Sequence, residues 1–214
     1  IGLKILDERN ASAAEHADLL ARLGVTLADA FIGCWHSKFE YDLLRPVTYI
    51  KRVIDPKWEP ILITPPFPEY PSGHSTQSGA AATVLTAFFG DNFAFTDNTH
   101  EKDKLPNRSF KSFWDAAEEA GVSRLYGGIH FRAAIDRGLE QGLCIGQHAA
   151  HNHTGQGPAP HVGVAVHNAG VAAAVVQVGL GRTSQMLVVL GWQYLANLAC
   201  QRAIRCEAPK DQCR

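Results

Sequence analysis

Three short clusters in the sequence carry cations, hydroxyl groups and histidines, which are the residue types that bind and transform an oxyanion. In the first cluster, Lys38 and Arg45 stand seven residues apart. On a helix that spacing is about two turns, so we expect both side chains to leave one face. Two cations on one stripe repel each other unless an anion or a carboxylate lies between them. A solvated charged face is the alternative interpretation.

The second cluster is Ser72, Gly73 and His74, at the point where a proline-rich loop enters a helix. A helix N-terminus offers free backbone amides and the positive end of a dipole, which together suit an anion. Gly73 allows the backbone to approach that anion closely. Ser72 can donate its hydroxyl, and His74 can exchange a proton near neutral pH. The alternative is an ordinary serine N-cap with an exposed histidine.

The third cluster contains Arg124 and His130. Arg124 supplies a planar fork of donors that matches tetrahedral oxyanions. Gly127 and Gly128 are expected to break the helix, so that His130 opens the next one. A neutral imidazole nitrogen at that place can attack the central atom of an oxyanion or ligate it. A core or capping histidine is the alternative.

Together the clusters hold three cations, a hydroxyl, a glycine amide and two histidines. Cations and preorganised donors neutralise the oxygens of a tetrahedral or trigonal-bipyramidal oxyanion. Three cations that face one cavity without an anion would destabilise the fold. Like charges about 4 Å apart repel by up to roughly 4 kcal/mol at an effective dielectric constant of about 20. We therefore expect the clusters to converge on a bound anion.

The order of the clusters resembles the three-part signature of a known superfamily. Lys, six residues, Arg-Pro, then Pro-Ser-Gly-His, then Ser-Arg, five residues, His is similar to the pattern of type 2 phosphatidic acid phosphatases and vanadium-dependent haloperoxidases. The match covers about residues 10–150. It implies an all-α fold, a helical bundle with the oxyanion site in its core. It also implies that the chain is the C-terminal half of a larger helical protein.

The resemblance implies a role for each cluster. Vanadate or phosphate would be held by Lys38, Arg45, Ser72, Gly73 and Arg124. His130 would ligate vanadium or act as the phosphoryl nucleophile, and His74 would be the acid–base group. One position departs from the pattern, which places an aspartate four residues after the second histidine to orient it. Here that position is Ala134, and the nearest carboxylate, Asp136, falls on a different helical face.

Two aromatic residues favour the haloperoxidase branch. Trp35, before Lys38, and Phe67, before Ser72, resemble aromatics near the halide position of chloroperoxidases in this superfamily. An aromatic wall lowers local polarity around a soft anion, although core packing would explain both residues equally well. This branch implies vanadate as cofactor, hydrogen peroxide and halide as substrates, and hypohalous acid as product. Lys38 would then polarise the bound peroxide.

Two alternatives stay open. An acid phosphatase of the same superfamily would use this site on a phosphate ester, with a phosphohistidine formed at His130. A non-catalytic fragment would bind oxyanions weakly or not at all, because the missing half of the protein would leave the pocket without a wall. The haloperoxidase and the phosphatase would share the oxyanion site, because vanadate mimics phosphate, and would differ in the pocket around it.

Helical patterns surround the three clusters. Apolar residues recur at helical spacing across 11–44, as one long helix or two, with Asn10 or Ser12 as the cap and Pro46 at the end. We expect further helices over 73–89, 109–126 and 131–150, a proline-rich loop over 52–73 and a polar loop over 91–107. No alternating pattern of useful length predicts a strand.

The composition is that of a globular chain, with 214 residues, 46% hydrophobic, 19% charged and a net charge of -1. Near-neutral charge excludes the broad positive field on which non-specific nucleic-acid binding depends. No acidic residue occurs between Glu140 and Glu207. We therefore divide the chain into a helical catalytic domain over 1–150 and an Ala/Val/Gly/His-rich tail over 151–214.

The tail contains a mostly apolar stretch over 162–180, which His167 and Asn168 interrupt. We expect a buried or amphipathic helix there rather than a membrane span, which needs about 20 predominantly apolar residues. The compartment is not settled by the residues themselves. The habit of the resembled superfamily favours the periplasm or secretion.

Overall fold

The computed structural model describes residues 1–153, which form a helical bundle with one small hairpin. The helices are α1 (Gly2–Glu8), α2 (Ala13–Tyr41), α3 (Pro46–Val53), α4 (Gly73–Phe89), α5 (Phe113–Tyr126) and α6 (Arg132–His153). The hairpin pairs β1 (Phe95–Asp97) with β2 (Arg108–Phe110) in antiparallel register, and a short 3-10 turn, η1 (Glu101–Asp103), lies between them. The all-α expectation is confirmed.

Serine side chains define where three of the helices begin. Ser12 forms a full capping box with Glu15 at the start of α2. Ser72 and Ser112 accept hydrogen bonds from the backbone amides three residues later, at the starts of α4 and α5. The helix expected over 11–44 is therefore a single helix, α2, that starts after its serine cap.

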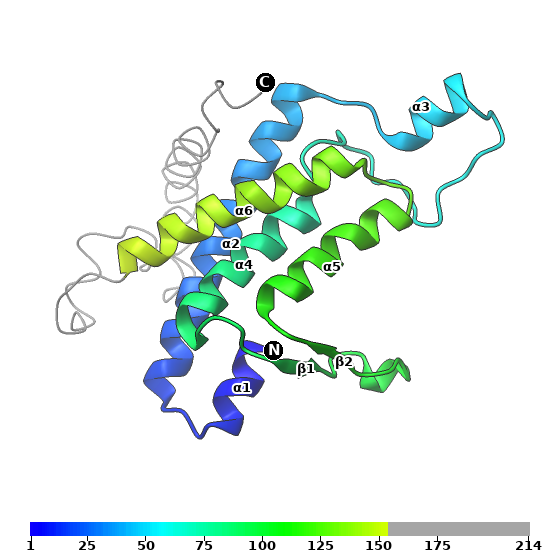
Figure 1. Cartoon of the computed structure of the whole chain (residues 1–214). Helices are drawn as coiled ribbons and strands as arrows, with labels where there is room; N and C mark the ends of the chain where they lie inside the picture. Colours follow the sequence, from blue (N-terminus) through cyan, green and yellow to red (C-terminus); the bar gives the residue numbers. More distant parts are fainter. Residues whose placement is uncertain (154–214) are drawn as a thin grey trace, which may run out of the picture.

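Helix α4 is central to the bundle and packs against α2, α5 and α6 (Figure 1). Its closest neighbour is α6, because glycines of α6 face the backbone of α4. A Cβ atom added to Gly138 would lie 2.8 Å from the carbonyl oxygen of Ser72, and one added to Gly142 would overlap the carbonyl oxygen of Thr76. The two backbones can approach this closely only because these positions lack side chains.

An apolar core fills the other end of the bundle, away from the predicted site. It joins buried side chains of α1, α2, α4 and α5: Ile5, Leu6, Leu19, Ala82, Leu85, Phe113 and Ala117. Aromatic rings from the loop and hairpin pack onto it, and Phe93 and Phe95 stack on Phe113. This core fixes the directions of α4 and α5, whose opposite ends carry the predicted site residues.

Three sequence expectations need correction. Lys38 and Arg45 do not share a helix, because α2 ends at Tyr41 with Asp42 in the left-handed region and Arg45 is the N-cap of α3. Pro46 begins α3 rather than ending α2, since its fixed φ suits a first helical turn. The hairpin over residues 95–110 occurs where no strand was expected, and the helix expected over 109–126 therefore begins only at Phe113.

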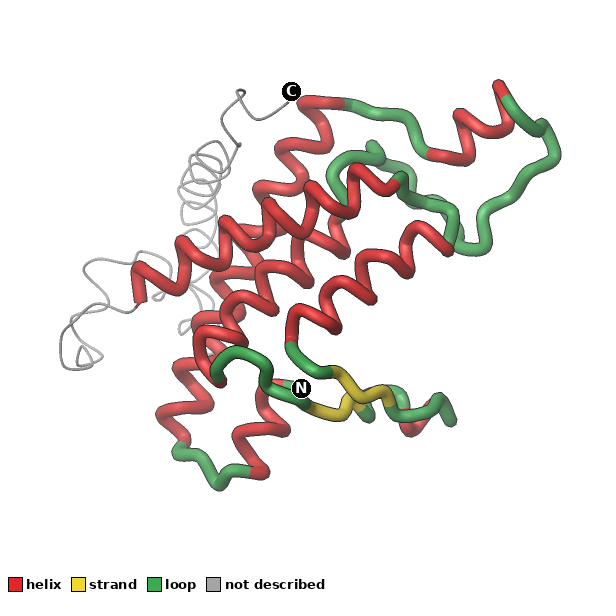
Figure 2. Tube along the Cα trace, in the orientation of Figure 1, coloured by secondary structure: helices red, strands yellow, loops and turns green. Residues whose placement is uncertain are grey.

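The long loop between α3 and α4 returns to the bundle at the end of α5 (Figure 2). The amide of Leu62 donates to the carbonyl of Gly127 at 3.0 Å, which anchors the loop there. Helix α6 is described as far as His153, and the domain boundary expected at residue 150 stays a prediction. The tail and its apolar stretch lie outside the described residues. Within residues 1–153, no helix is long and apolar enough to cross a membrane.

Candidate active site

The nine predicted site residues come from one end of the bundle, where α2 and α5 end and where α3, α4 and α6 begin. Lys38 is in the last turn of α2, and Arg124 is in the last turn of α5. Ser72, Gly73 and His74 form the start of α4. Arg45, Phe67 and His130 lie in the connecting segments, and Trp35 lies on α2 one turn before the lysine. The helix ends thus bring together clusters that are far apart in the chain.

Arg45 and His130 are in direct contact at this end. The guanidinium Nη1 of Arg45 donates to His130 Nε2 at 3.2 Å and to the carbonyl oxygen of Ile129 at 2.9 Å. Its Nε donates to the carbonyl oxygen of Phe67 at 2.9 Å. Only 6% of Arg45 is exposed, and its Nη2 is buried without a hydrogen-bond partner among residues 1–153. A buried cationic donor without a partner is costly, and an oxyanion would satisfy it.

His130 is held from both sides of its ring. Its Nδ1 lies 2.8 Å from Glu69 Oε1, and both side chains are almost completely buried. Because an arginine can only donate, Nε2 must accept the bond from Arg45. The hydrogen then sits on Nδ1 and points to the carboxylate. Burial lowers the pKa of His130, which keeps the ring neutral and its Nε2 lone pair available.

Glu69 is the functional residue that the sequence reasoning missed. A carboxylate partner was sought on α6 after His130, where Asp136 is exposed. The carboxylate instead comes from the loop before α4, within the run Pro-Glu-Tyr-Pro-Ser-Gly-His. A glutamate placed among prolines and aromatics directly before the second cluster was the available signal, since an acidic residue is rarely buried unless it has a partner.

Lys38 is completely buried, and its ammonium group is surrounded by backbone oxygens. It donates to the carbonyl groups of Pro68 at 3.1 Å, Glu69 at 3.0 Å and Pro71 at 2.5 Å. All three N–H groups are therefore in use, and an oxyanion would have to replace one carbonyl. Burial lowers the pKa of Lys38 to about 8. The lysine holds the loop over 68–71 against the end of α2.

His74 and Arg124 form a second contact pair on the more open side. Arg124 Nη1 lies 3.4 Å from His74 Nε2, and its Nε donates to the hydroxyl of Ser123 at 3.0 Å. The imidazole is exposed, and its pKa is lowered by partial burial and by the neighbouring cation. A neutral, solvent-facing imidazole of this kind can take up or release a proton.

Ser72 and Gly73 set the position of the first turn of α4. The amide of Ser72 donates to the carbonyl of Ala134 on α6 at 2.8 Å, and its buried hydroxyl caps the helix by accepting from Ser75. Gly73 lies against Trp35, because an added Cβ would be 3.3 Å from the indole ring. Gly73, predicted to bind the oxyanion, and Trp35, predicted to line the halide pocket, are therefore neighbours.

The aromatic pair flanks the buried cations. The Trp35 and Phe67 ring centroids are 5.1 Å apart, and Lys38 Nζ lies 5.8 Å and 5.4 Å from them. Arg45 Cζ lies 5.0 Å from the Phe67 centroid. Both rings are half-buried, so they combine packing with cation–π contacts. A role for the two rings in a halide pocket stays a prediction.

The charges at this end of the bundle do not balance. Lys38 and Arg45 are buried beside one buried carboxylate, Glu69, and Arg124 adds a further cation on the open side. The residual charge is positive, and the unpartnered Nη2 of Arg45 faces no acceptor within residues 1–153. Together with the neutral His130, these residues fit a tetrahedral oxyanion such as vanadate or phosphate.

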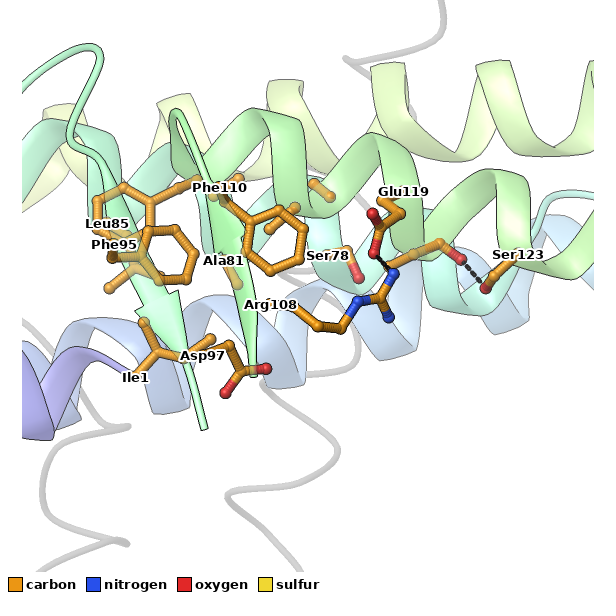
Figure 3. A pocket seen from close by; sticks show the side chains of 15 residues that line it. Ile1, Ser78, Ala81, Leu85, Phe95, Asp97, Arg108, Phe110, Glu119 and Ser123 are labelled. Carbon is orange, nitrogen blue, oxygen red and sulfur yellow. Dashed lines mark hydrogen bonds and ion pairs between the residues drawn. The ribbon is translucent and has the colours of Figure 1, made fainter. Parts of the chain in front are cut away.

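A separate cavity of about 310 Å³ lies between α4, α5 and the hairpin (Figure 3). Alanines and aromatic rings line most of it, and an ion pair between Arg108 and Glu119 borders it. Its lining includes none of the nine predicted site residues, although Ser123 lies beside Arg124 at one end. The titratable pairs described above therefore mark the better candidate site.

Comparison with known proteins identifies the family. The model of the VCPO second helical-bundle domain matches residues 18–57 and 52–156, which contain all nine predicted site residues. The chain belongs to this family. The resemblance stated from the three clusters is thereby confirmed, and it extends to the vanadium chloroperoxidase-like branch.

Two relatives show how far the similarity within the family extends. The vanadium chloroperoxidase of Curvularia inaequalis is 26% identical in an alignment 170 residues long, which covers 56% of this chain and 28% of the relative. The crystal structure of a bacterial vanadium-dependent iodoperoxidase is 51% identical with a TM-score of 0.65, over 69% of this chain and 35% of that chain. The chain therefore spans about a third or less of the length of these family members.

Proposed function

We propose that the chain carries the vanadate-binding site of a vanadium-dependent haloperoxidase, which oxidises a halide with hydrogen peroxide to hypohalous acid. The observation that carries this proposal is the contact between Arg45 and His130. It places an unpartnered cationic donor beside a neutral imidazole nitrogen in a buried, positively charged site. The vanadium haloperoxidases among the relatives support the same choice.

The residues divide into those that hold the oxyanion and those that move protons. Arg45, Arg124, Ser72 and the amide of Gly73 would hold the oxygens, and His130 Nε2 would ligate vanadium. Arg45 would transfer its donor from the imidazole to the oxyanion, which frees the Nε2 lone pair. Bound vanadate supplies Lewis-acid activation of hydrogen peroxide toward attack by halide.

Proton transfer and charge stabilisation fall to the remaining two side chains. His74 faces solvent beside Arg124, so it can take a proton from hydrogen peroxide and return one to the product. Lys38, with a pKa of about 8, stays charged at neutral pH. By exchanging one of its three carbonyl contacts for an oxygen of the substrate, it would stabilise the negative charge that develops there.

Trp35 and Phe67 would form the halide side of the site. They cover the two buried cations with aromatic carbon and limit access of water to them. A large, weakly hydrated anion loses least on entering such surroundings. The 51% identity to an iodoperoxidase makes iodide the halide that we propose first.

The test is iodide and bromide oxidation by hydrogen peroxide while orthovanadate is titrated into the full chain. We expect turnover that saturates with vanadate and that is lost in His130→Ala. The matched control is His36→Ala, because His36 is an exposed histidine of α2 that pairs with Glu40 outside the site. Full turnover in His130→Ala would contradict the assigned ligand.

The same preparation separates the two alternative functions. Hydrolysis of a phosphate ester without halide oxidation would replace the haloperoxidase by a phosphatase that uses His130 as nucleophile. A folded chain with neither activity, and with a melting temperature unchanged by vanadate, would leave a non-catalytic fragment. A vanadate-dependent rise in melting temperature that His130→Ala abolishes would support the proposed binding site even where turnover is slow.

A further inference from the structure

Glu69, which lies just before the second cluster, makes four hydrogen bonds to residues in or beside the first and third clusters. Its amide donates to the carbonyl of Leu43 at 2.9 Å, and its carbonyl accepts from Lys38 Nζ at 3.0 Å. Its carboxylate Oε1 faces His130 Nδ1 at 2.8 Å and accepts from the amide of Phe131 at 2.9 Å. The residue is 2% exposed. Its backbone thus ties the end of α2, while its side chain ties the start of α6.

We propose that Glu69 is the positioning residue that fixes His130 as the Nδ1–H tautomer and directs its Nε2 lone pair into the oxyanion site. In this role it replaces the aspartate that the family pattern places four residues after this histidine, where this chain has Ala134. The role toward an oxyanion rests on the proposed function. The tautomer itself is a property of the chain alone.

The hydrogen-bond network permits only one tautomer of His130. With the proton on Nε2, the ring would turn an N–H toward the guanidinium of Arg45, and two donors would face each other. At the same time the bare Nδ1 would lie against the carboxylate of Glu69, and two acceptors would face each other. Moving the proton to Nδ1 turns both contacts into hydrogen bonds. A partner on the second ring nitrogen is the usual means of fixing which nitrogen ligates.

The ring orientation is fixed by the same carboxylate oxygen. Oε1 accepts from the ring of His130 and from the amide of Phe131, the next residue in the chain. The ring of His130 and the backbone of Phe131, just before α6, are therefore both held by one carboxylate oxygen of the loop. The charge of Glu69 also offsets two buried cations, Lys38 and Arg45, which a neutral residue would not do.

No other described carboxylate is placed to do this. Position 134 is alanine and completely buried, and Asp136 points away on the exposed side of α6. The buried acidic residues within residues 1–153 are Asp29 and Glu69, and Asp29 lies more than two turns before Lys38 on α2. Glu69 is thus the described carboxylate in contact with the site.

The experiment follows the His130 tautomer directly in the full chain, with isotope-labelled histidine and long-range proton–nitrogen NMR. The variants are Glu69→Leu, which removes the acceptor, and Glu69→Gln, which keeps the volume and an acceptor oxygen but removes the charge. Glu40→Gln is the matched control, because Glu40 faces His36 Nδ1 at 3.5 Å on the exposed surface of α2. His130→Ala identifies the signal.

The wild type and Glu40→Gln should show a single Nδ1–H tautomer with a slowly exchanging ring proton. In Glu69→Leu we expect the Nε2–H form to appear, because only the 3.2 Å contact with Arg45 then opposes it, and the same Nη1 also donates to the carbonyl of Ile129 at 2.9 Å. The affinity for orthovanadate should fall about 10- to 100-fold. In Glu69→Gln the Nδ1–H form should persist, but its proton should exchange faster, because a neutral acceptor forms a weaker bond than a carboxylate. Circular dichroism verifies that each variant is folded.

An unchanged Nδ1–H tautomer in folded Glu69→Leu would overturn the proposal. If that variant does not fold, Glu69→Gln decides: a ring proton with unchanged shift and exchange rate would overturn it. A tautomer that shifts while orthovanadate affinity stays within twofold of wild type would refute the role toward the oxyanion. A wild type that binds no orthovanadate would instead refute the proposed function, and the tautomer measurement would still decide the role of Glu69.

Discussion

Replacing Arg45 by lysine tests how the site is assembled, because the change keeps the charge and removes the fork. Arg45 donates to the carbonyl oxygens of Phe67 and Ile129 and to His130 Nε2. A lysine ammonium at that position can reach one of these three acceptors. Two buried hydrogen bonds are then lost, at about 1–1.5 kcal/mol each, so we expect Arg45→Lys to destabilise the chain by about 2–3 kcal/mol.

For a domain of this size that loss lowers the melting temperature by about 4–12 °C, measured by the helical circular dichroism signal. Arg22→Lys is the matched control, since Arg22 makes one ion pair with Asp18 at the surface of α2. That exchange should change stability by less than about 0.5 kcal/mol. Equal melting temperatures for the two variants would show that the fork does not join the loop before α4 to the segment before α6.

Two further predictions concern charge burial and helix packing. The pKa of Lys38 is about 8 in the folded state and 10.5 in the unfolded chain. Between pH 8 and pH 10.5 the unfolded state therefore binds more protons than the folded state. The free energy of unfolding of the wild type, measured with urea, should therefore rise by up to about 3 kcal/mol relative to that of Lys38→Met as the pH rises from 8 to 10.5. If the difference between the two proteins stays constant or falls over this range, the burial argument is contradicted. Gly142→Ala should destabilise by about 1–3 kcal/mol because its Cβ would overlap the α4 backbone. Gly24→Ala, on an open face of α2, should stabilise the chain by about 0.5–1 kcal/mol. If Gly24→Ala and Gly142→Ala change the free energy of unfolding in the same direction, the close contact of α4 with α6 is disproved.

Helix positions followed well from local signals. The helix expected over 73–89 has the same bounds as α4. A serine N-cap precedes its first residue, and Gly90 follows its last residue. The start of α2 followed from Ser12, one of the two caps expected, whereas α5 begins at Phe113, four residues after its expected start. A capping hydrogen bond joins residues only three positions apart, so the sequence alone is sufficient to predict it.

Short elements were missed where local and tertiary preferences compete. Pro46 was interpreted as the end of one helix and instead begins α3, an eight-residue helix that starts after the left-handed Asp42. The hairpin strands have three residues each, too few for a pattern to show. Their stability comes from Phe95 and Phe110, which pack together next to the core.

The three clusters, and the oxyanion chemistry they predict, follow from residue types and spacing in the chain, because cations, glycines and histidines are recognisable in any conformation. How they meet does not. Lys38 turns to backbone carbonyls instead of an open cavity, and Arg45 reaches His130 from a loop rather than from a shared helix face. The partner of His130 is Glu69, a residue 61 positions away. A contact over that distance depends on where α2 ends, how the proline-rich loop returns and where α6 begins, and only packing of the whole bundle determines these together.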